Sequence, residues 1–212
     1  MSTPKAVGAD TADGDPLALA LFGLTVVSGL IDAVSYLGLG HVFAANMTGN
    51  VVVIGFALAG APGFSVIGST TALAAFLLGA ALAGRLTAGR LRPALAAESA
   101  LHLVAAAVLF AAGRDGAVQY GVIALLALAM GLRNATVRSL GVPDLTTTVL
   151  TMTLTGLAAE PRSPRRRRRV LAALTMIAGV VPGSVLVLHD QAGWALLAAA
   201  ALTAATAALY RG

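Results

Sequence analysis

The sequence predicts an all-α integral membrane protein with six to eight membrane segments in two repeated halves. Of its 212 residues, 58% are hydrophobic and only 11% are charged, whereas about a quarter of the residues in soluble domains are charged. Eight apolar stretches follow one another, and the 13 Arg and one Lys gather mostly between them. The composition excludes a soluble globular domain and a disordered chain, and the basic residues sit where membrane-protein loops carry them, which argues against nucleic-acid binding.

The apolar stretches lie at about 16–39, 42–61, 65–86, 95–113, 117–132, 145–159, 170–188 and 191–210. A membrane-crossing helix needs roughly 20 apolar residues, so residues 16–212 are expected to form a single transmembrane domain. Residues 1–15 contain one Lys and three Asp. They lack the basic flank of a secretory signal, so we expect a short disordered tail.

The arginines test the number of crossings, because short basic loops face the cytoplasm. With eight crossings, Arg85–Arg92 and Arg165–Arg169 fall on opposite sides. Seven crossings result if 145–159 does not cross, and six if 42–61 also stays on one side. Six crossings put both termini and the Arg-rich loops on the cytoplasmic face of a bacterial cytoplasmic membrane, with Arg114 opposite. Because 42–61 is long enough to span, all three counts stay open.

An internal repeat appears when the chain is shifted by about 100 residues. The halves cover about 16–113 and 117–210, and three full crossings in each would make them inverted, an arrangement common in transporters. The matching features are Gly29 with Gly131, Asp32 with Asn134, Leu39-Gly40 with Leu140-Gly141, Asn46–Thr48 with Thr146–Thr148, and Gly79 with Gly179.

Two polar groups interrupt the first half. Asp32 lies inside the first apolar stretch, where an ionisable group indicates function unless it is a hydrated helix end. Asn46-Met-Thr-Gly-Asn50 precedes the apolar run Val51–Ala59. This block predicts a discontinuous helix with an unwound backbone at Gly49, whose free amides could meet a solute; an ordinary N-cap is the alternative.

The second half carries a matching polar region. Six of the eleven residues in 145–155 are Thr, and their hydroxyls require a protein interior or a water-lined cavity. Arg133 precedes Asn134 in the position that matches Asp32. It could pair with Asp32 across the axis that relates the halves, or extend to the cytoplasmic surface, which we favour slightly.

Glu98 and His102 are spaced i,i+4 and therefore share one face of a helix. Their spacing fits a proton relay, but Pro93 places them near the expected membrane edge, which favours an interfacial polar pair. The three histidines are scattered and cysteine is absent, so no metal site, disulfide or cofactor is expected.

The stretch Gly29–Gly40, followed by Val42–Asn50, resembles the YoaK-like family of bacterial membrane proteins, the DUF1275 or UPF0700 group. The resemblance extends over nearly the whole chain, and its second-half pattern is Asp144, Thr147, Thr148 and Thr151. It implies a multi-pass membrane protein, often with about six crossings. It carries over no catalytic residue.

These observations lead to a small-solute or ion transporter as the first hypothesis and a non-transporting regulatory or assembly protein as the rival. An enzyme is not expected, because no catalytic arrangement stands out. The partners would be membrane lipid, an unknown small solute or ion, and a second copy of the chain if it is a homo-oligomer; no nucleic acid is expected. The predicted binding residues are Asp32, Asn46, Thr48, Gly49, Asn50, Asn134, Thr148 and Thr151.

Overall fold

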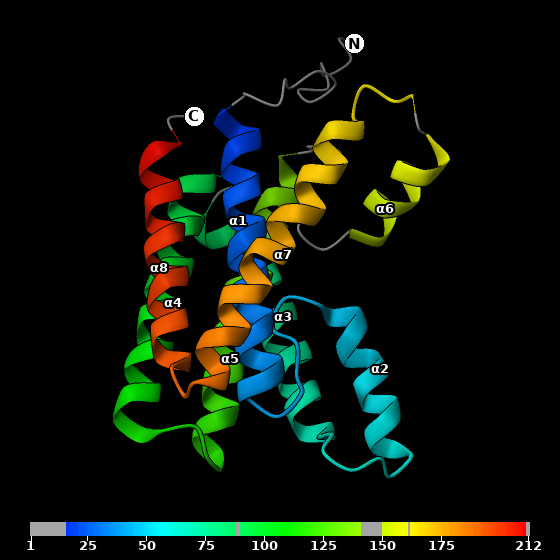
Figure 1. Ribbon diagram of the computed structural model, residues 1–212. Helices are drawn as coiled ribbons and strands as arrows, with labels where there is room; N and C mark the ends of the chain where they lie inside the picture. Colours follow the sequence, from blue (N-terminus) through cyan, green and yellow to red (C-terminus); the bar gives the residue numbers. More distant parts are fainter. Residues whose placement is uncertain (1–15, 88–89, 141–149, 161, 211–212) are drawn as a thin grey trace.

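The computed structural model describes residues 16–87, 90–140, 150–160 and 162–210, and its regular elements in these ranges are all helical (Figure 1). The predicted all-α fold is confirmed, while the predicted tail over 1–15 lies outside the described residues. The helices are α1 (Pro16–Ala33), which continues as a π-helical segment (Val34–Gly38), α2 (Met47–Leu58), α3 (Val66–Leu86), α4 (Leu91–Ala112), α5 (Ala117–Ser139), α6 (Leu150–Ala159), α7 (Arg166–Leu188) and α8 (Ala192–Leu209).

Six helices in the described part of the chain are long and apolar enough to cross a membrane: α1 with its π-helical segment, α3, α4, α5, α7 and α8. The helix α2 contains 12 residues, and the described part of α6 contains 10. At about 1.5 Å per residue they are roughly 18 and 15 Å long, about half the hydrocarbon thickness of ~30 Å. Helix length therefore supports the six-crossing interpretation over seven or eight.

The two short helices lie on the same side of the bundle of long helices (Figure 1). Both begin near its mid-height and run toward opposite ends, α2 against α3 and α6 against α7. Their amino ends therefore face the middle of the molecule. This is the arrangement expected of the two interrupted segments in the sequence.

The long helices pack in a pattern that is unchanged when the two halves are exchanged. The helix α1 of the first half packs on α7 of the second, and equivalently α5 of the second half packs on α3 of the first. Likewise α8 contacts α1 as α4 contacts α5, and α4 and α8 contact each other. This pairing is what two related halves would give. The repeat itself and its inverted orientation stay predictions.

Glycines allow the closest of these contacts. A Cβ at Gly29 would collide with the backbone of α7 near Gly179, and a Cβ at Gly131 would collide with the backbone of α3 at Phe76. Lipid tails are as apolar as Leu, so helices in a membrane associate through close packing between small residues rather than through the hydrophobic effect. The glycines at 79 and 179, which the sequence analysis aligned, serve the two equivalent contacts.

The central helices are α1 and α5. In their apolar windows 78% and 61% of the residues are buried, against 28% and 22% in α3 and α7. The main core joins Val27 and Ile31 of α1, Leu126 and Met130 of α5, and Leu196 of α8. Polar side chains on α1 and α5 are consequently enclosed by protein, whereas α3 and α7 present apolar side chains outward.

The described arginines other than the buried Arg133 lie at the two ends of the bundle. One end, where α1 begins and α8 ends, holds Arg85, Arg90, Arg92, Arg138, Arg162 and Arg165–Arg169; Arg114 lies at the other end (Figure 1). The helix directions thus give the charge asymmetry that the six-crossing interpretation requires.

Candidate functional site

Asp32 lies near the end of α1, beside the loop that leads to α2. The chain passes from α-helix to π-helix after Ala33, and Gly40 and His41 adopt positive φ angles that turn it back. A positive φ suits Gly but is uncommon for other residues. The returning loop brings the backbone N–H of Ala45 to Asp32, to which it donates at 2.8 Å from Oδ1. The residue Asp32 is 6% exposed.

Asn46 and Asn50 fix the start of α2. The Oδ1 atom of Asn46 accepts a hydrogen bond from the backbone N–H of Gly49 at 3.2 Å, which makes Asn46 the N-cap. Asn50 is fully buried; it accepts from the N–H of Phe43 at 2.8 Å and donates to the C=O of Phe43 at 2.6 Å. The loop is therefore held against the first turn of α2 by side-chain amides.

The role that the sequence predicted for Gly49 is wrong, because Gly49 lies within the first turn of α2 and its backbone is helical. The ring of Phe43 packs against this turn, and a Cβ at Gly49 would fall 2.5 Å from a ring carbon. The glycine thus provides room for an aromatic ring. The discontinuity in the chain lies before Asn46, in the loop.

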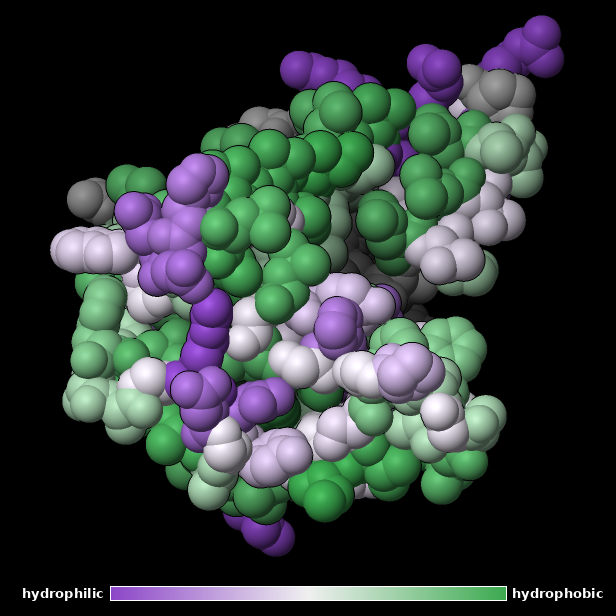
Figure 2. Space-filling model, turned by 60° about the horizontal axis from the view of Figure 1, so that its bottom comes forward, coloured by the Kyte–Doolittle hydropathy of each residue, from purple (hydrophilic) through white to green (hydrophobic). Residues whose placement is uncertain are grey.

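A cavity of about 490 Å³ lies where α1, α2, α6 and α7 meet. Figure 2 shows the surface hollowed between the two short helices, with pale and purple residues at the edge of the hollow. Five predicted residues line the cavity, namely Asp32, Asn46, Thr48, Gly49 and Thr151. Residues that the sequence placed in two separate interrupted segments therefore share one cavity.

The other three predicted residues have different places. Asn50 is occupied by its two bonds to Phe43. Asn134 is partly buried on α5 and is not among the residues that line the cavity. Thr148 lies outside the described residues. The candidate site is thus narrower than the sequence predicted.

Aromatic side chains supply much of the remaining cavity wall, and the sequence analysis did not identify them. Tyr36, Phe43 and Phe56 line it together with Met176 of α7. The rings of Tyr36 and Phe43 are stacked, with centroids 4.6 Å apart. In the sequence these aromatic residues only add to the apolar character of the segment. Their stacking depends on the loop that turns back at Gly40 and His41, so it could not be predicted from the spacing.

The cavity combines a carboxylate with aromatic faces and hydroxyl or amide groups. The amino end of α2 lies beside Asp32, and helix amino ends favour a nearby negative charge. Oδ1 of the carboxylate accepts from the backbone N–H of Ala45, and Asp32 lines the cavity. Carboxylates and aromatic faces both attract cations, so the wall can bind a proton, a cation or the positively charged part of a solute. Among the described residues, no group of three or more His, Asp and Glu could hold a metal ion.

A match to a protein-family model extends over nearly the whole chain. A family model described as a protein of unknown function, DUF1275, matches residues 20–209. The chain belongs to the DUF1275 family. The match extends from α1 to the end of α8, so the cavity and the helices around it all lie within the DUF1275 region. The resemblance that the sequence analysis based on Asn46–Asn50 is confirmed.

The DUF1275 assignment is supported by a relative. The chain is 34% identical over 145 residues to the UPF0700 transmembrane protein YoaK of Bacillus subtilis (strain 168). The alignment spans 65% of this chain and 64% of YoaK, which is less than two thirds of that relative's length. No solved structure matches the chain. The protein is therefore a multi-pass membrane protein of the DUF1275 family.

A second polar cluster in this DUF1275 protein overturns two sequence-based interpretations. Arg133 neither reaches the surface nor forms an ion pair with Asp32: its side chain is fully buried, and its Nη1 lies 3.0 Å from Oε1 of Glu98. Glu98 and His102 are also fully buried, so protein surrounds them where a hydrated pair at the surface was expected. Packing of α4 between α5 and α8 encloses both.

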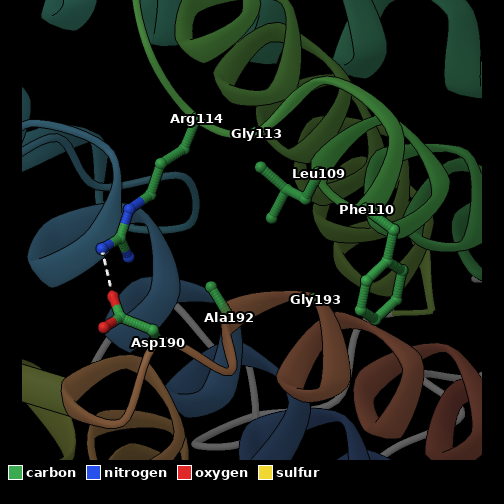
Figure 3. A pocket seen from close by; sticks show the side chains of 7 residues that line it. All are labelled: Leu109, Phe110, Gly113, Arg114, Asp190, Ala192 and Gly193. Atoms are coloured by element: carbon green, nitrogen blue, oxygen red, sulfur yellow. Dashed lines mark hydrogen bonds and ion pairs between the residues drawn. The ribbon is translucent and has the colours of Figure 1, made fainter.

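A smaller cavity of about 220 Å³ lies at the end of the bundle opposite the arginine-rich one (Figure 3). Arg114 and Asp190 meet across its rim, with Nη2 2.6 Å from Oδ1. Their side chains are 39% and 83% exposed, so this pair is screened by solvent. It joins the α4–α5 turn to the α7–α8 turn and offers no buried polar group to a ligand.

Proposed function

We propose that the protein is a small-solute or ion transporter of the bacterial cytoplasmic membrane, with its polar site in the cavity beside Asp32. The observation that carries this proposal is that both halves of the chain line one cavity. Asp32, Asn46 and Thr48 come from the first half, and Thr151 and Met176 from the second. Transporters with two related halves bind their solutes between the halves, beside helices that begin within the membrane.

The two short helices fit this role because of where they begin. The amino end of α2 and the first described turn of α6 face the middle of the bundle, and they contain Thr48 and Thr151. The amino end of α2 has a positive partial charge, because the first N–H groups of a helix have no partner within it. A polar solute in the cavity therefore meets hydroxyl and amide groups from both halves.

Each lining residue has a definite part in the proposal. Asp32 is the carboxylate that binds the coupling proton or the cationic part of the solute. Asn46, Thr48 and Thr151 coordinate the polar groups of the solute, and the stacked rings of Tyr36 and Phe43 form an apolar wall. The arginine-rich end faces the cytoplasm, as basic loops of bacterial membrane proteins do.

The test measures proton flux in reconstituted vesicles. The purified protein is placed in liposomes that contain a pH-sensitive dye, and small amines, carboxylic acids and monovalent cations are added outside one class at a time. We expect one class to drive a proton flux that Asp32→Asn abolishes. The matched control is Asp190→Asn, an identical chemical change in an exposed side chain at the end of the bundle.

The results separate the proposal from its rival. Equal flux in Asp32→Asn and the unsubstituted protein would remove the coupling role of Asp32. No flux with any class, in protein shown to be folded and inserted, would favour a non-transporting regulatory or assembly protein, in which the polar residues only pack the helices.

A further inference from the structure

Glu98, His102 and Arg133 form a buried ionisable cluster that the proposed transport site does not use. None of the three residues has any exposed surface. Glu98 and His102 lie one turn apart on α4, and Arg133 lies on α5. Charged groups enclosed in a membrane protein are costly and are a default indication of function.

Arg133 is held by both neighbouring helices. Its Nη1 donates to Oε1 of Glu98 at 3.0 Å and to the C=O of Leu24 at 3.1 Å. Its Nη2 donates to Oγ of Ser28 at 2.5 Å. The guanidinium is therefore fixed between α1 and α4, and because arginine keeps its proton in proteins it supplies a permanent positive charge.

The remaining polar atoms of the cluster have no protein partner. These are Oε2 of Glu98, Nε of Arg133 and both ring nitrogens of His102. They comprise an acceptor, a donor, and a ring that offers one of each when neutral. Leaving such groups dry is unfavourable, and a buried water commonly satisfies groups of this kind. The set is complementary to internal water.

We propose that Glu98, His102 and Arg133 form an internal, hydrated proton-binding site, separate from the cavity at Asp32. With Glu98 ionised and His102 neutral, the cluster has no net charge. Uptake of one proton from solution, at Oε2 of Glu98 or through water at a ring nitrogen of His102, raises its net charge by one. Release returns the same proton, and no bond between heavier atoms changes.

The surroundings leave Glu98 with few other ionisable neighbours. On α5 it is paired with Arg133, whose partners on α1 are the C=O of Leu24 and the hydroxyl of Ser28, and the ionisable residue of α1 is Asp32. The helix α8 has no ionisable residue between Ala192 and Leu209. The one ionisable residue of α3, at position 85, is exposed near the end of that helix.

Arg133 also connects this cluster to the cavity. Ser28, which binds its guanidinium, lies one turn before Asp32 on α1. The charge of Arg133 is close enough to act on both Asp32 and His102. A proton bound in the cluster therefore changes the electrostatic potential at Asp32, which gives the transport site a means of sensing protonation.

The test needs no transported solute, so it is independent of the proposed function. Infrared difference spectra of the purified protein in lipid nanodiscs are recorded as the pH is lowered, in an Asp32→Asn background that removes the cavity carboxylate. We expect a protonated-carboxyl band, sensitive to deuterium, that is lost when Glu98→Gln is added. It is retained when Glu160→Gln is added, because Glu160 is 59% exposed and lies outside the cluster.

A second variant keeps the test decisive if Glu98→Gln does not fold. His102→Gln leaves the ion pair of Glu98 with Arg133 intact, and we expect it to shift the pH midpoint of the Glu98 band by about one unit. Persistence of the band in Glu98→Gln, absence of any such band in the Asp32→Asn background, or an unshifted midpoint in His102→Gln would overturn the proposal.

Discussion

Gly29 and Gly179 bring α1 and α7 into direct backbone contact. A Cβ at Gly29 would meet α7 at Gly179 and Val180, and a Cβ at Gly179 would meet the backbone of α1. Gly131 and Gly79 have the same relationship between α5 and α3. The two contacts fix the long helices on either side of the bundle, and hence the positions of the short helices that pack on α3 and α7.

Gly131→Ala should therefore destabilise the protein. The added methyl group would collide with the backbone of α3 at Phe76, which cannot move without separating the helices. Overpacking of this kind costs about 1–3 kcal/mol. The free energy of unfolding, measured by titrating detergent micelles with SDS, should fall by that amount.

Gly121→Ala is the control for this change, because it makes the identical substitution on the same helix. Gly121 is exposed, and nothing lies within 4 Å of a Cβ placed there. Since alanine favours helix over glycine by about 1 kcal/mol, the control should be neutral or stabilising. Equal losses of unfolding free energy in Gly131→Ala and Gly121→Ala would show that the close contact between α5 and α3 does not limit residue size at position 131.

Asn50→Ala should release the loop from α2. The substitution removes both hydrogen bonds to the backbone of Phe43 and leaves its partly buried N–H and C=O without this partner. Each unsatisfied buried group costs about 1–3 kcal/mol. Hydrogen exchange should show faster exchange of the amides in α2, with little change in α5.

Thr48→Ala serves as the comparison for Asn50→Ala. Thr48 is on the same turn of α2, but its side chain is exposed toward the cavity. Its removal should leave amide exchange in α2 nearly unchanged. Similar acceleration in both variants would contradict the anchoring role of Asn50.

The membrane location and the broken segments could be predicted from the sequence because both depend on local composition. The lengths of the apolar stretches predicted the long helices, and the Asn and Thr residues predicted two polar segments, near 46 and 151, which the structure brings to one cavity. The family resemblance followed from the same Asn46–Asn50 block. These features require no knowledge of which helix packs on which.

The partners of the buried polar side chains could not be predicted, because they depend on the rotation of each helix about its own axis. Arg133 follows the apolar run of α5, and nothing local distinguishes a surface arginine from one that faces α4. Asn134, adjacent to it in the sequence, points elsewhere for the same reason: neighbouring helical residues differ by about 100° in direction. The aromatic wall depends likewise on how the loop before α2 returns.

The buried ion pair of Arg133 with Glu98 and the exposed pair of Arg114 with Asp190 should differ greatly in their effect on stability. Arg133→Met leaves Glu98 buried without its partner, and breaking a buried pair costs about 3–5 kcal/mol. Arg114→Met breaks a solvent-exposed pair with Asp190, which is worth about 0–1 kcal/mol. The unfolding free energies of the two variants should be compared in the same detergent. A small loss in Arg133→Met would show that Glu98 readily becomes neutral or finds another partner.

The six-crossing topology predicts which loops share a side of the membrane. The chain has no cysteine, so single cysteines can be introduced one at a time without removing native ones. Ala61→Cys, Asp115→Cys and Gln191→Cys lie in the turns at the end opposite the arginine-rich one, and Ser163→Cys lies at the arginine-rich end. In intact cells a membrane-impermeant maleimide should label the first three, and Ser163→Cys should react only after the membrane is opened. Protection of position 61 while position 115 is labelled would mean that α2 crosses the membrane, and the six-crossing topology would then be wrong.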